Sequence, residues 1–333
     1  MKNTKTKNSK KNYTLFKLDY DMTSEEYHGT PGTYSSSQLK DLMEEDTDLF
    51  YKKWISKEIA RKESDVFDLG TYVHTAVLEP EKLKKECPIY PGKVKAGEKW
   101  KKFKAAHAGK TILTQSQADT GNKLARAVAA SKSSTSLIEV CDPEVSLFVE
   151  LGINPDTREI VYKSIPGSSE TMGLLPNGEW VPFPNMARSY YVWVVLKVRA
   201  DALSLKNGFI LDLKTTSSNA RSEEECEKST KYYNYDLSAA FYMDLFNTVL
   251  DGKITDFYWT YVSKTHLNCR THRALPETLM TGRAKWTRAA INLARGIRDG
   301  WDSVDSIGEI GPDLYDYTKY VLKQTKQSDA DLL

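Results

Sequence analysis

Cysteine is scarce in this sequence: 333 residues contain four, and no two of them form a C-x-x-C pair (Cys87, Cys141, Cys226 and Cys269). Such sparse, scattered cysteines argue against a disulfide framework or a structural zinc site and favour a reducing compartment. Long apolar runs are missing too, since none approaches the ~20 residues of a bilayer-spanning helix. The first twelve residues, MKNTKTKNSKKN, lack the apolar segment of a signal peptide. We therefore expect a cytoplasmic protein without membrane contact.

A strong net charge is also absent, because 47 basic and 45 acidic side chains leave only +2. Attraction to nucleic acid must then come from local clusters. The densest cluster is residues 82–110, where ten lysines and two glutamates are interleaved with Trp100 and Phe103. This stretch is either a solvated helix face or a wall that contacts phosphates, and the candidate DNA contacts in it are Lys93, Lys95 and Lys101.

Several catalytic signatures are missing. The sequence has no Gly-rich phosphate loop of the P-loop type, so helicase or ATPase activity is not supported. It also offers no Ser-His-Asp or Cys-His arrangement for nucleophilic catalysis.

With 40% apolar residues, the composition that remains is that of a globular protein. We expect its fold class to be α/β. We expect a basic disordered arm over residues 1–18, one domain over 19–325 and a frayed tail over 326–333. Within the domain we expect a helical part over 33–131, a β-rich core over 141–265 and a C-terminal helix over 275–299.

Periodicity and capping residues predict the individual elements. Helices are expected from residue 38, over 49–61, 65–80, from 114 to about 130, and over 221–230, 235–250 and 275–298. Strands are expected over 144–151, 190–199, around residue 212 and over 254–262. The Pro- and Gly-rich segment 165–185 is expected to be irregular. Gly70, costly inside a helix, indicates close approach of another backbone.

The chemistry centres on the segment VRADALSLKNGFILDLKTT, residues 198–216. A turn at Lys206–Gly208 would fold it into a hairpin and bring Asp201 beside Asp212. Because strand side chains alternate, Asp212 and Lys214 share one face. This arrangement suits a divalent cation and a phosphodiester, although the spacing alone fits a charged surface hairpin about equally well.

Two further positions stand out. His74 lies on the inward stripe of the helix predicted over 65–80, where a lone histidine is more often a core residue than a ligand. Ser238 and Tyr242 are four residues apart on a predicted helix and therefore share a face.

Taken together, these segments resemble the PD-(D/E)XK nucleases, and most closely the exonuclease VIII (RecE) branch found in phages and prophages. The resemblance covers roughly residues 33–265. It is carried by five segments in order: YSSSQLKDL, FDLGTYVHTAVLEP, VRADAL, GFILDLKTT and YDLSAAFYMD.

The resemblance implies a central mixed sheet flanked by helices and 5′-to-3′ digestion of linear double-stranded DNA. It implies Mg²⁺, with Mn²⁺ as a substitute, held by His74, Asp201, Asp212 and the Leu213 carbonyl, and Lys214 as the catalytic lysine. Family members often form rings around DNA and work beside a single-strand annealing protein. If the protein is encoded by a phage, its expected location is the cytoplasm of the bacterial host. Candidates for DNA contact or site support are Tyr242, Ser238, Thr215, Arg199 and Glu144.

One position departs from the family, because Ser238 replaces the glutamine of a Q-x-x-x-Y motif. An iron–sulfur nuclease with the same core is excluded, since only Cys269 follows the Tyr242 helix. An inert DNA-binding or inhibitor module and a structure-specific endonuclease remain as alternatives.

Overall fold

The longest strand, β8 (Val192–Ser204), lies in the interior of the main sheet between β9 and β4. Its sequence, VWVVLKVRADALS, is rich in the β-branched and aromatic residues that suit a strand buried on both faces. It pairs with β4 (Asp142–Ile153) along nearly its whole length. The computed structural model describes residues 13–44, 47–60, 65–163, 170–184 and 188–301.

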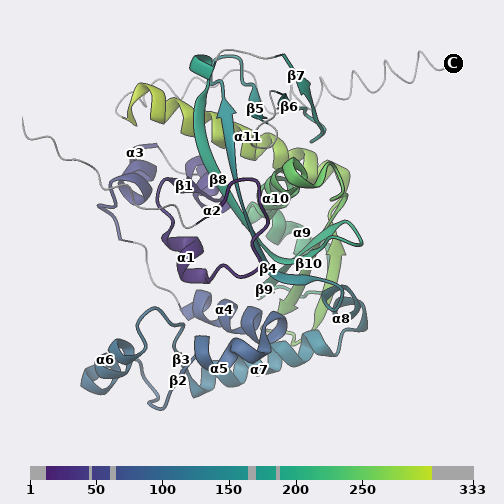
Figure 1. The fold of residues 1–333 in the computed structure, drawn as a ribbon. Helices are drawn as coiled ribbons and strands as arrows, with labels where there is room; N and C mark the ends of the chain where they lie inside the picture. The colour runs from purple at the N-terminus through teal and green to yellow at the C-terminus, as the bar shows by residue number, and fades with distance from the viewer. Residues whose placement is uncertain (1–12, 45–46, 61–64, 164–169, 185–187, 302–333) are drawn as a thin grey trace, which may run out of the picture.

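The main sheet has nine strands within this described part of the chain, in the order β11-β10-β9-β8-β4-β5-β6-β7, with β1 beside β8 (Figure 1). The β9–β10 and β1–β8 pairs are parallel and the others are antiparallel, so the sheet is mixed. The remaining strands are β1 (Thr33–Tyr34), β5 (Ile160–Lys163), β6 (Thr171–Leu174), β7 (Trp180–Phe183), β9 (Phe209–Thr216), β10 (Asp256–Ser263) and β11 (Cys269–Arg273). A small separate pair joins β2 (Ile89–Tyr90) and β3 (Leu113–Thr114).

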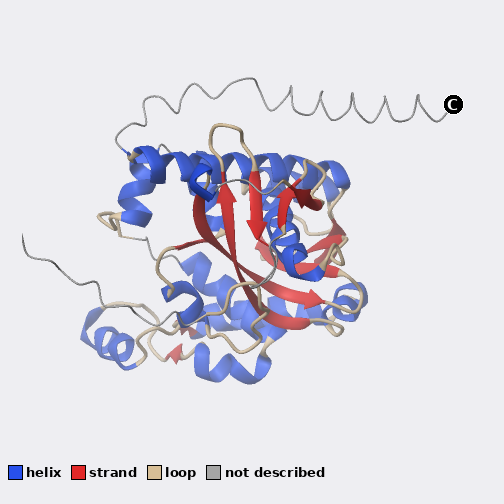
Figure 2. Cartoon of the chain, turned by 45° about the horizontal axis from the view of Figure 1, so that its top comes forward, coloured by secondary structure: helices blue, strands red, loops and turns tan. Residues whose placement is uncertain are grey.

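Helices cover both faces of the sheet (Figure 2). On one face, α2 (Ser36–Glu44), α10 (Tyr235–Leu250) and α11 (Pro276–Asp299) enclose the main core, which includes Trp286, Phe241 and Leu196. On the other face, α4 (Asp65–Leu78) and α7 (Gln115–Ala129) pack on β9 and β10 through a second core around Val73, Leu124 and Leu213.

The other helices are short: α1 (Ser24–Gly29), α3 (Thr47–Phe50), α5 (Leu83–Glu86), α6 (Gly97–Ala106), α8 (Lys132–Ile138) and α9 (Glu223–Tyr232). A π-helical turn covers Tyr51–Ile55, and 3₁₀ turns cover Pro80–Lys82 and Arg188–Tyr190. The helices of the described chain fall short of the length and apolarity that crossing a membrane requires.

Most predicted elements are confirmed. The helix expected from residue 114 is α7, which begins with a capping box: Thr114 Oγ1 accepts from the Gln117 N–H, and Gln117 Oε1 accepts from the Thr114 N–H. The fold class is confirmed as mixed α/β with helices flanking a central sheet. Gly70 does not meet another backbone, because a Cβ at this position would have the side-chain atom Thr215 Oγ1 as its nearest neighbour, at 3.8 Å. The predicted close approach at Gly70 is therefore wrong.

Three predicted boundaries are also wrong. The segment 165–185 is not irregular throughout, since β6 and β7 extend the sheet there. The predicted arm is not free over residues 13–18, because Phe16 N–H donates to the Phe148 carbonyl at 2.8 Å and Tyr13 stacks on the Phe148 ring. The helix expected over 49–61 ends at Ile55. Residues 1–12 and 302–333 lie outside the described part, so the rest of the arm and the tail stay predictions.

Candidate functional site

The site forms where strands β8 and β9 separate. Their antiparallel ladder runs from Ser204↔Phe209 to Ala202↔Leu211 and ends one step before Asp201 and Asp212. Beyond that point the Leu213 N–H donates to Asp201 Oδ2 at 2.8 Å, so a carboxylate replaces the missing backbone acceptor. The predicted hairpin is confirmed, and its open end brings the two aspartates together.

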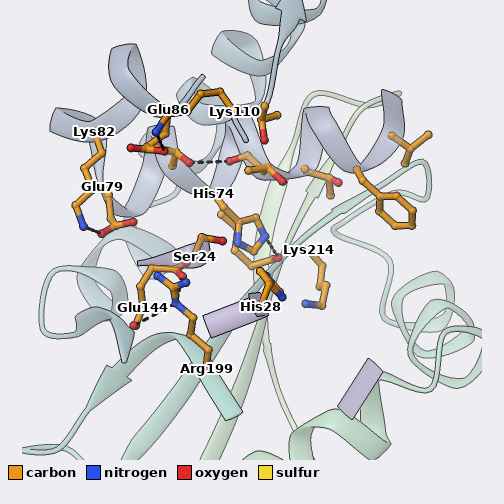
Figure 3. Close-up of a pocket in the computed structure, with 18 of the residues that line it drawn as sticks. Ser24, His28, His74, Glu79, Lys82, Glu86, Lys110, Glu144, Arg199 and Lys214 are labelled. Carbon is orange, nitrogen blue, oxygen red and sulfur yellow. Dashed lines mark hydrogen bonds and ion pairs between the residues drawn. The ribbon is translucent and has the colours of Figure 1, made fainter. Parts of the chain in front are cut away.

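His74 reaches this opening from α4. Its Nε2 lies 2.6 Å from the Leu213 carbonyl oxygen and its Nδ1 lies 3.4 Å from Asp201 Oδ2 (Figure 3). With the proton on Nε2 donated to that carbonyl, Nδ1 presents a lone pair toward the carboxylate. His74 therefore lines the pocket and is not enclosed in the apolar core.

Glu144, predicted only as a candidate for DNA contact or site support, completes a group of possible metal ligands with His74 and Asp201. In the β4–β8 register it lies opposite Asp201, between the pairs Pro143↔Ala202 and Val145↔Ala200. His74, Glu144 and Asp201 each place one ligand atom within 4.8 Å of the other two. Arg199 Nε holds the Glu144 carboxylate at 2.6 Å. Glu144 has φ +55°, an uncommon conformation for a residue with a side chain.

Asp212 and Lys214 share one face, as predicted. Lys214 Nζ lies 2.5 Å from Asp212 Oδ1 and 5.2 Å from the centre of the Tyr235 ring. Burial alone would lower the pKa of Lys214, but the carboxylates of Asp212 and Asp201 outweigh it and raise that pKa. The lysine is thus an ammonium held against a buried carboxylate.

Burial also shifts the other ionisable groups. It lowers the pKa of His74 to about 4, assisted by the Lys214 charge, so the imidazole is neutral near pH 7. Burial raises the pKa of Asp212 to about 7. The charge of Lys214 lowers this pKa, and the neighbouring Asp201 raises it further. Burial is also the main cause that raises the pKa of Asp201. Acids crowded in this way bind protons or cations to relieve their repulsion.

The pocket above these groups has a volume of about 1240 Å³. Of the predicted residues, His74, Leu213, Lys214, Thr215, Arg199 and Glu144 line it. Lys93, Lys95 and Lys101 do not. Lys95 pairs with Asp68 at 2.8 Å and Lys101 with Glu98 at 2.9 Å, on the loop before α6 and on α6 itself. The lysines of the basic stretch that do line the pocket are Lys82, Lys85 and Lys110.

Ser238 and Tyr242 are not among the residues that line the pocket, although they share a face of α10. Ser238 is 6% exposed, which leaves little room for the longer glutamine of the family pattern. Tyr242 is partly buried. Burial raises the pKa of its hydroxyl well above the usual value, and the nearby Tyr27, Asp212 and Asp201 raise it further. Tyr242 therefore lies near the two aspartates without lining the pocket.

The donor set fits a hard divalent cation. It combines carboxylate oxygens, a backbone carbonyl and one neutral imidazole, which suits Mg²⁺ and also Mn²⁺. Neighbouring corners of a magnesium octahedron lie roughly 3 Å apart. The 3.4 Å between His74 Nδ1 and Asp201 Oδ2 is close to that spacing.

The mixed sheet between helices, with Asp-x10-Asp-x-Lys at its opened strand pair, fits the fold of the PD-(D/E)XK nucleases. Residues 189–301 match the family model of a PDDEXK-like domain of unknown function (DUF3799). This segment contains both aspartates and Lys214, whereas His74 and Glu144 precede it.

A solved structure described as a putative exonuclease from Eubacterium rectale has a similar fold, with a TM-score of 0.50 and 14% identity. The similarity covers 88% of this chain and 89% of that one. No curated protein matches the sequence.

Proposed function

We propose that this protein is a metal-dependent exodeoxyribonuclease that hydrolyses phosphodiester bonds of linear double-stranded DNA. The observation that carries the proposal is the convergence of His74, Glu144 and Asp201 beside the Asp212–Lys214 pair, at a pocket that His74, Glu144 and Lys214 line. The PDDEXK-like family match and the fold shared with a putative exonuclease support it.

The cation, Mg²⁺ in this proposal, would be held by His74, Glu144 and Asp201, with Asp212 and the Leu213 carbonyl beside them. When bound, such an ion polarises the phosphoryl group and lowers the pKa of a bound water. Lys214 supplies a fixed ammonium that stabilises charge developing on the phosphate or orients the attacking water. Arg199 holds Glu144 in place and adds positive charge to the pocket.

Finer features of the proposal rest on the sequence resemblance to the exonuclease VIII branch. They are 5′-to-3′ polarity, production of 3′ single-stranded overhangs for recombination, a single-strand annealing partner, and a ring-shaped assembly of several copies. We include them in the proposal because the segment with Asp201, Asp212 and Lys214, on which the proposed chemistry depends, is also part of the resemblance.

End-labelled linear duplex and a covalently closed circle of the same sequence, each with Mg²⁺ or with EDTA, test the function. We expect label to be released from the linear duplex only when Mg²⁺ is present, while the circle stays intact. Equal degradation of the circle would assign an endonuclease instead. Absence of cleavage on both, with Mg²⁺ or Mn²⁺, would favour an inert DNA-binding module.

Glu144 is predicted to contribute directly to cation affinity. Glu144→Gln keeps the shape of the side chain but removes its charge, so we expect Mn²⁺ to bind at least about tenfold more weakly, as for other losses of site support. Titration by electron paramagnetic resonance without DNA measures this. Glu150→Gln is the matched control, because Glu150 is also on β4 and paired with an arginine, Arg188, outside the pocket. Equal affinities for the two variants would remove Glu144 from the ligand set.

Lys85 is predicted to contact a phosphate. Lys82 and Lys110 are paired with Glu79 and Glu86, whereas exposed Lys85 has no ion pair among the described residues that line the pocket. Lys85→Gln should reduce the slope of log K against log salt on duplex DNA by about 0.9. Lys93→Gln, an exposed lysine of the same stretch outside the pocket, should leave the slope unchanged. Fluorescence anisotropy in EDTA provides both slopes, and identical values for the two variants would contradict the assignment.

A further inference from the structure

The two sides of the pocket differ in charge and chemistry. The acidic side chains of the described lining come from α1 and the residues just before it, the α4–α5 region and β4, away from Lys214 (Asp21, Glu25, Glu79, Glu86 and Glu144). Figure 3 shows Glu79, Glu86 and Glu144 across the pocket from Lys214. The opposite wall is built by the end of β9, the loop that follows, α9 and the end of β10. Its polar lining is hydroxyls and lysines: Lys214, Thr215, Thr216, Ser217, Ser218, Ser229 and Lys264.

This hydroxyl wall carries a row of tyrosines. Tyr233 and Tyr235 both line the pocket, and their rings are stacked with centres 5.4 Å apart and planes 26° apart. Tyr232 meets the edge of Tyr233 at 4.8 Å. Tyr232 is 77% exposed and Tyr233 is 53% exposed, whereas Tyr235 is more enclosed and lies beneath Lys214. The row therefore leads from solvent to the lysine of the site.

The turn between α9 and α10 fixes this row. Asn234 has φ +49° and ψ +44°, a left-handed conformation that asparagine adopts more readily than most residues. Its Oδ1 accepts a hydrogen bond from Lys285 Nζ at 2.8 Å, and the same ammonium lies 2.8 Å from Asp236 Oδ2. This anchored kink places Tyr233 and Tyr235 face to face on the pocket side.

We infer that the wall of Tyr233, Tyr235, Lys264 and the hydroxyls of residues 215–218 binds a single-stranded segment of DNA next to the bond being cut. A base stacks on the exposed part of Tyr233, and the adjoining phosphates meet the hydroxyls and Lys264. This inference rests on the proposed nuclease function and adds the form of DNA that the site accepts.

Single-stranded DNA fits this wall better than duplex DNA for two reasons. Stacking on tyrosine needs the open face of a base, and inside a duplex every such face except the terminal one is covered by the next pair. Aromatic rings interleaved with cations and hydroxyls, without acidic neighbours in the described lining of this wall, are also the usual chemistry of single-strand binding. A duplex end would therefore have to be opened locally before its strand reached Lys214.

Binding of a fluorescent oligothymidylate, measured by anisotropy in EDTA, tests the inference without cleavage. Tyr233→Ala should weaken binding about tenfold, since stacking on one aromatic ring contributes roughly 1–3 kcal/mol per base. Tyr233→Phe keeps the ring and should stay within about twofold of the wild-type protein. Tyr190→Ala, also an exposed tyrosine but outside the pocket, should have no effect. A blunt hairpin duplex should be affected much less than the single strand.

Equal binding by Tyr233→Ala and Tyr190→Ala would overturn the inference, as would an equal loss in Tyr233→Ala and Tyr233→Phe. Hydrolysis of a small chromogenic phosphodiester by the wild-type protein with Mn²⁺ separates this result from the nuclease proposal. If the wild type hydrolyses neither that diester nor DNA, but Tyr233→Ala still loses single-strand affinity, the nuclease proposal fails and the binding wall stands.

Discussion

Asp201→Asn is expected to lower Mg²⁺-dependent hydrolysis of linear duplex DNA about a thousand-fold, because a bound cation supplies several kcal/mol of transition-state stabilisation. The fold should survive the change. An amide oxygen can still accept the Leu213 N–H that Asp201 Oδ2 accepts at 2.8 Å. Burial raises the pKa of Asp201 and so penalises its charge, which a neutral amide does not carry. We therefore expect unchanged or higher resistance to urea.

Two measurements on the same preparations check this prediction: initial rates on end-labelled duplex, and urea unfolding followed by tryptophan fluorescence. Asp251→Asn is the matched control, because Asp251 is exposed, outside the pocket, and in a left-handed conformation that asparagine accepts. It should retain full activity. If Asp201→Asn cleaved within tenfold of the wild-type rate, the cation would have to be held elsewhere.

The paired aspartates were predictable because a hairpin is local in sequence. Lys206–Gly208 supply the turn, the apolar alternation fixes which residues face each other, and Lys214 follows Asp212 by two residues. His74 was different. It comes from a helix that is distant in the sequence. Its position on an apolar stripe indicates a core residue, and only the family resemblance indicates a metal ligand. Only tertiary packing of α4 on β9 brings it to 2.6 Å from Leu213.

The position of Glu144 is harder to predict from the sequence. It is a candidate for site support in the sequence, but its place beside His74 and Asp201 depends on the β4–β8 register across 56 intervening residues. Nothing local in the sequence sets that register. The basic stretch shows the same limit, because charge density left a solvated face and a phosphate-contacting wall as alternatives. The fold then directs only Lys82, Lys85 and Lys110 of this stretch to the pocket. Lys93, Lys95 and Lys101 are not among the residues that line the pocket.

The Pro- and Gly-rich segment shows the same limit. Its strands β6 and β7 are four residues each, too short to display a clear alternation. What orders them lies outside the segment. Trp180 Nε1 donates to the Asp244 carbonyl at 2.9 Å, and Gly178 lies against Arg283 so closely that a Cβ there would meet the guanidinium at 2.3 Å. The β6–β7 hairpin thus packs against a buried ion pair between Asp244 of α10 and Arg283 of α11.

That ion pair gives the largest stability effect that we expect. Arg283 contacts Asp244 through two hydrogen bonds of 2.7 and 2.8 Å, and Trp286 Nε1 donates to the same carboxylate at 2.8 Å. The side chains are 8% and 1% exposed. Arg283→Met removes the partner of a buried charge, so the free energy of unfolding should fall by roughly 3–5 kcal/mol. Arg273→Met, which breaks an exposed pair with Asp256, should cost at most about 1 kcal/mol.

Urea unfolding at two pH values separates loss of charge pairing from loss of packing. Burial raises the pKa of Asp244 even with Arg283 present. Without the guanidinium the folded protein binds a proton at Asp244 that the unfolded chain does not hold, so stability falls as pH rises. The deficit of Arg283→Met should therefore be smaller at pH 5 than at pH 8. Adding Asp244→Leu should restore much of the loss at pH 8, because it removes the unpaired charge. A deficit independent of pH and unrelieved in the double variant would show that Arg283 acts through packing against the β6–β7 turn.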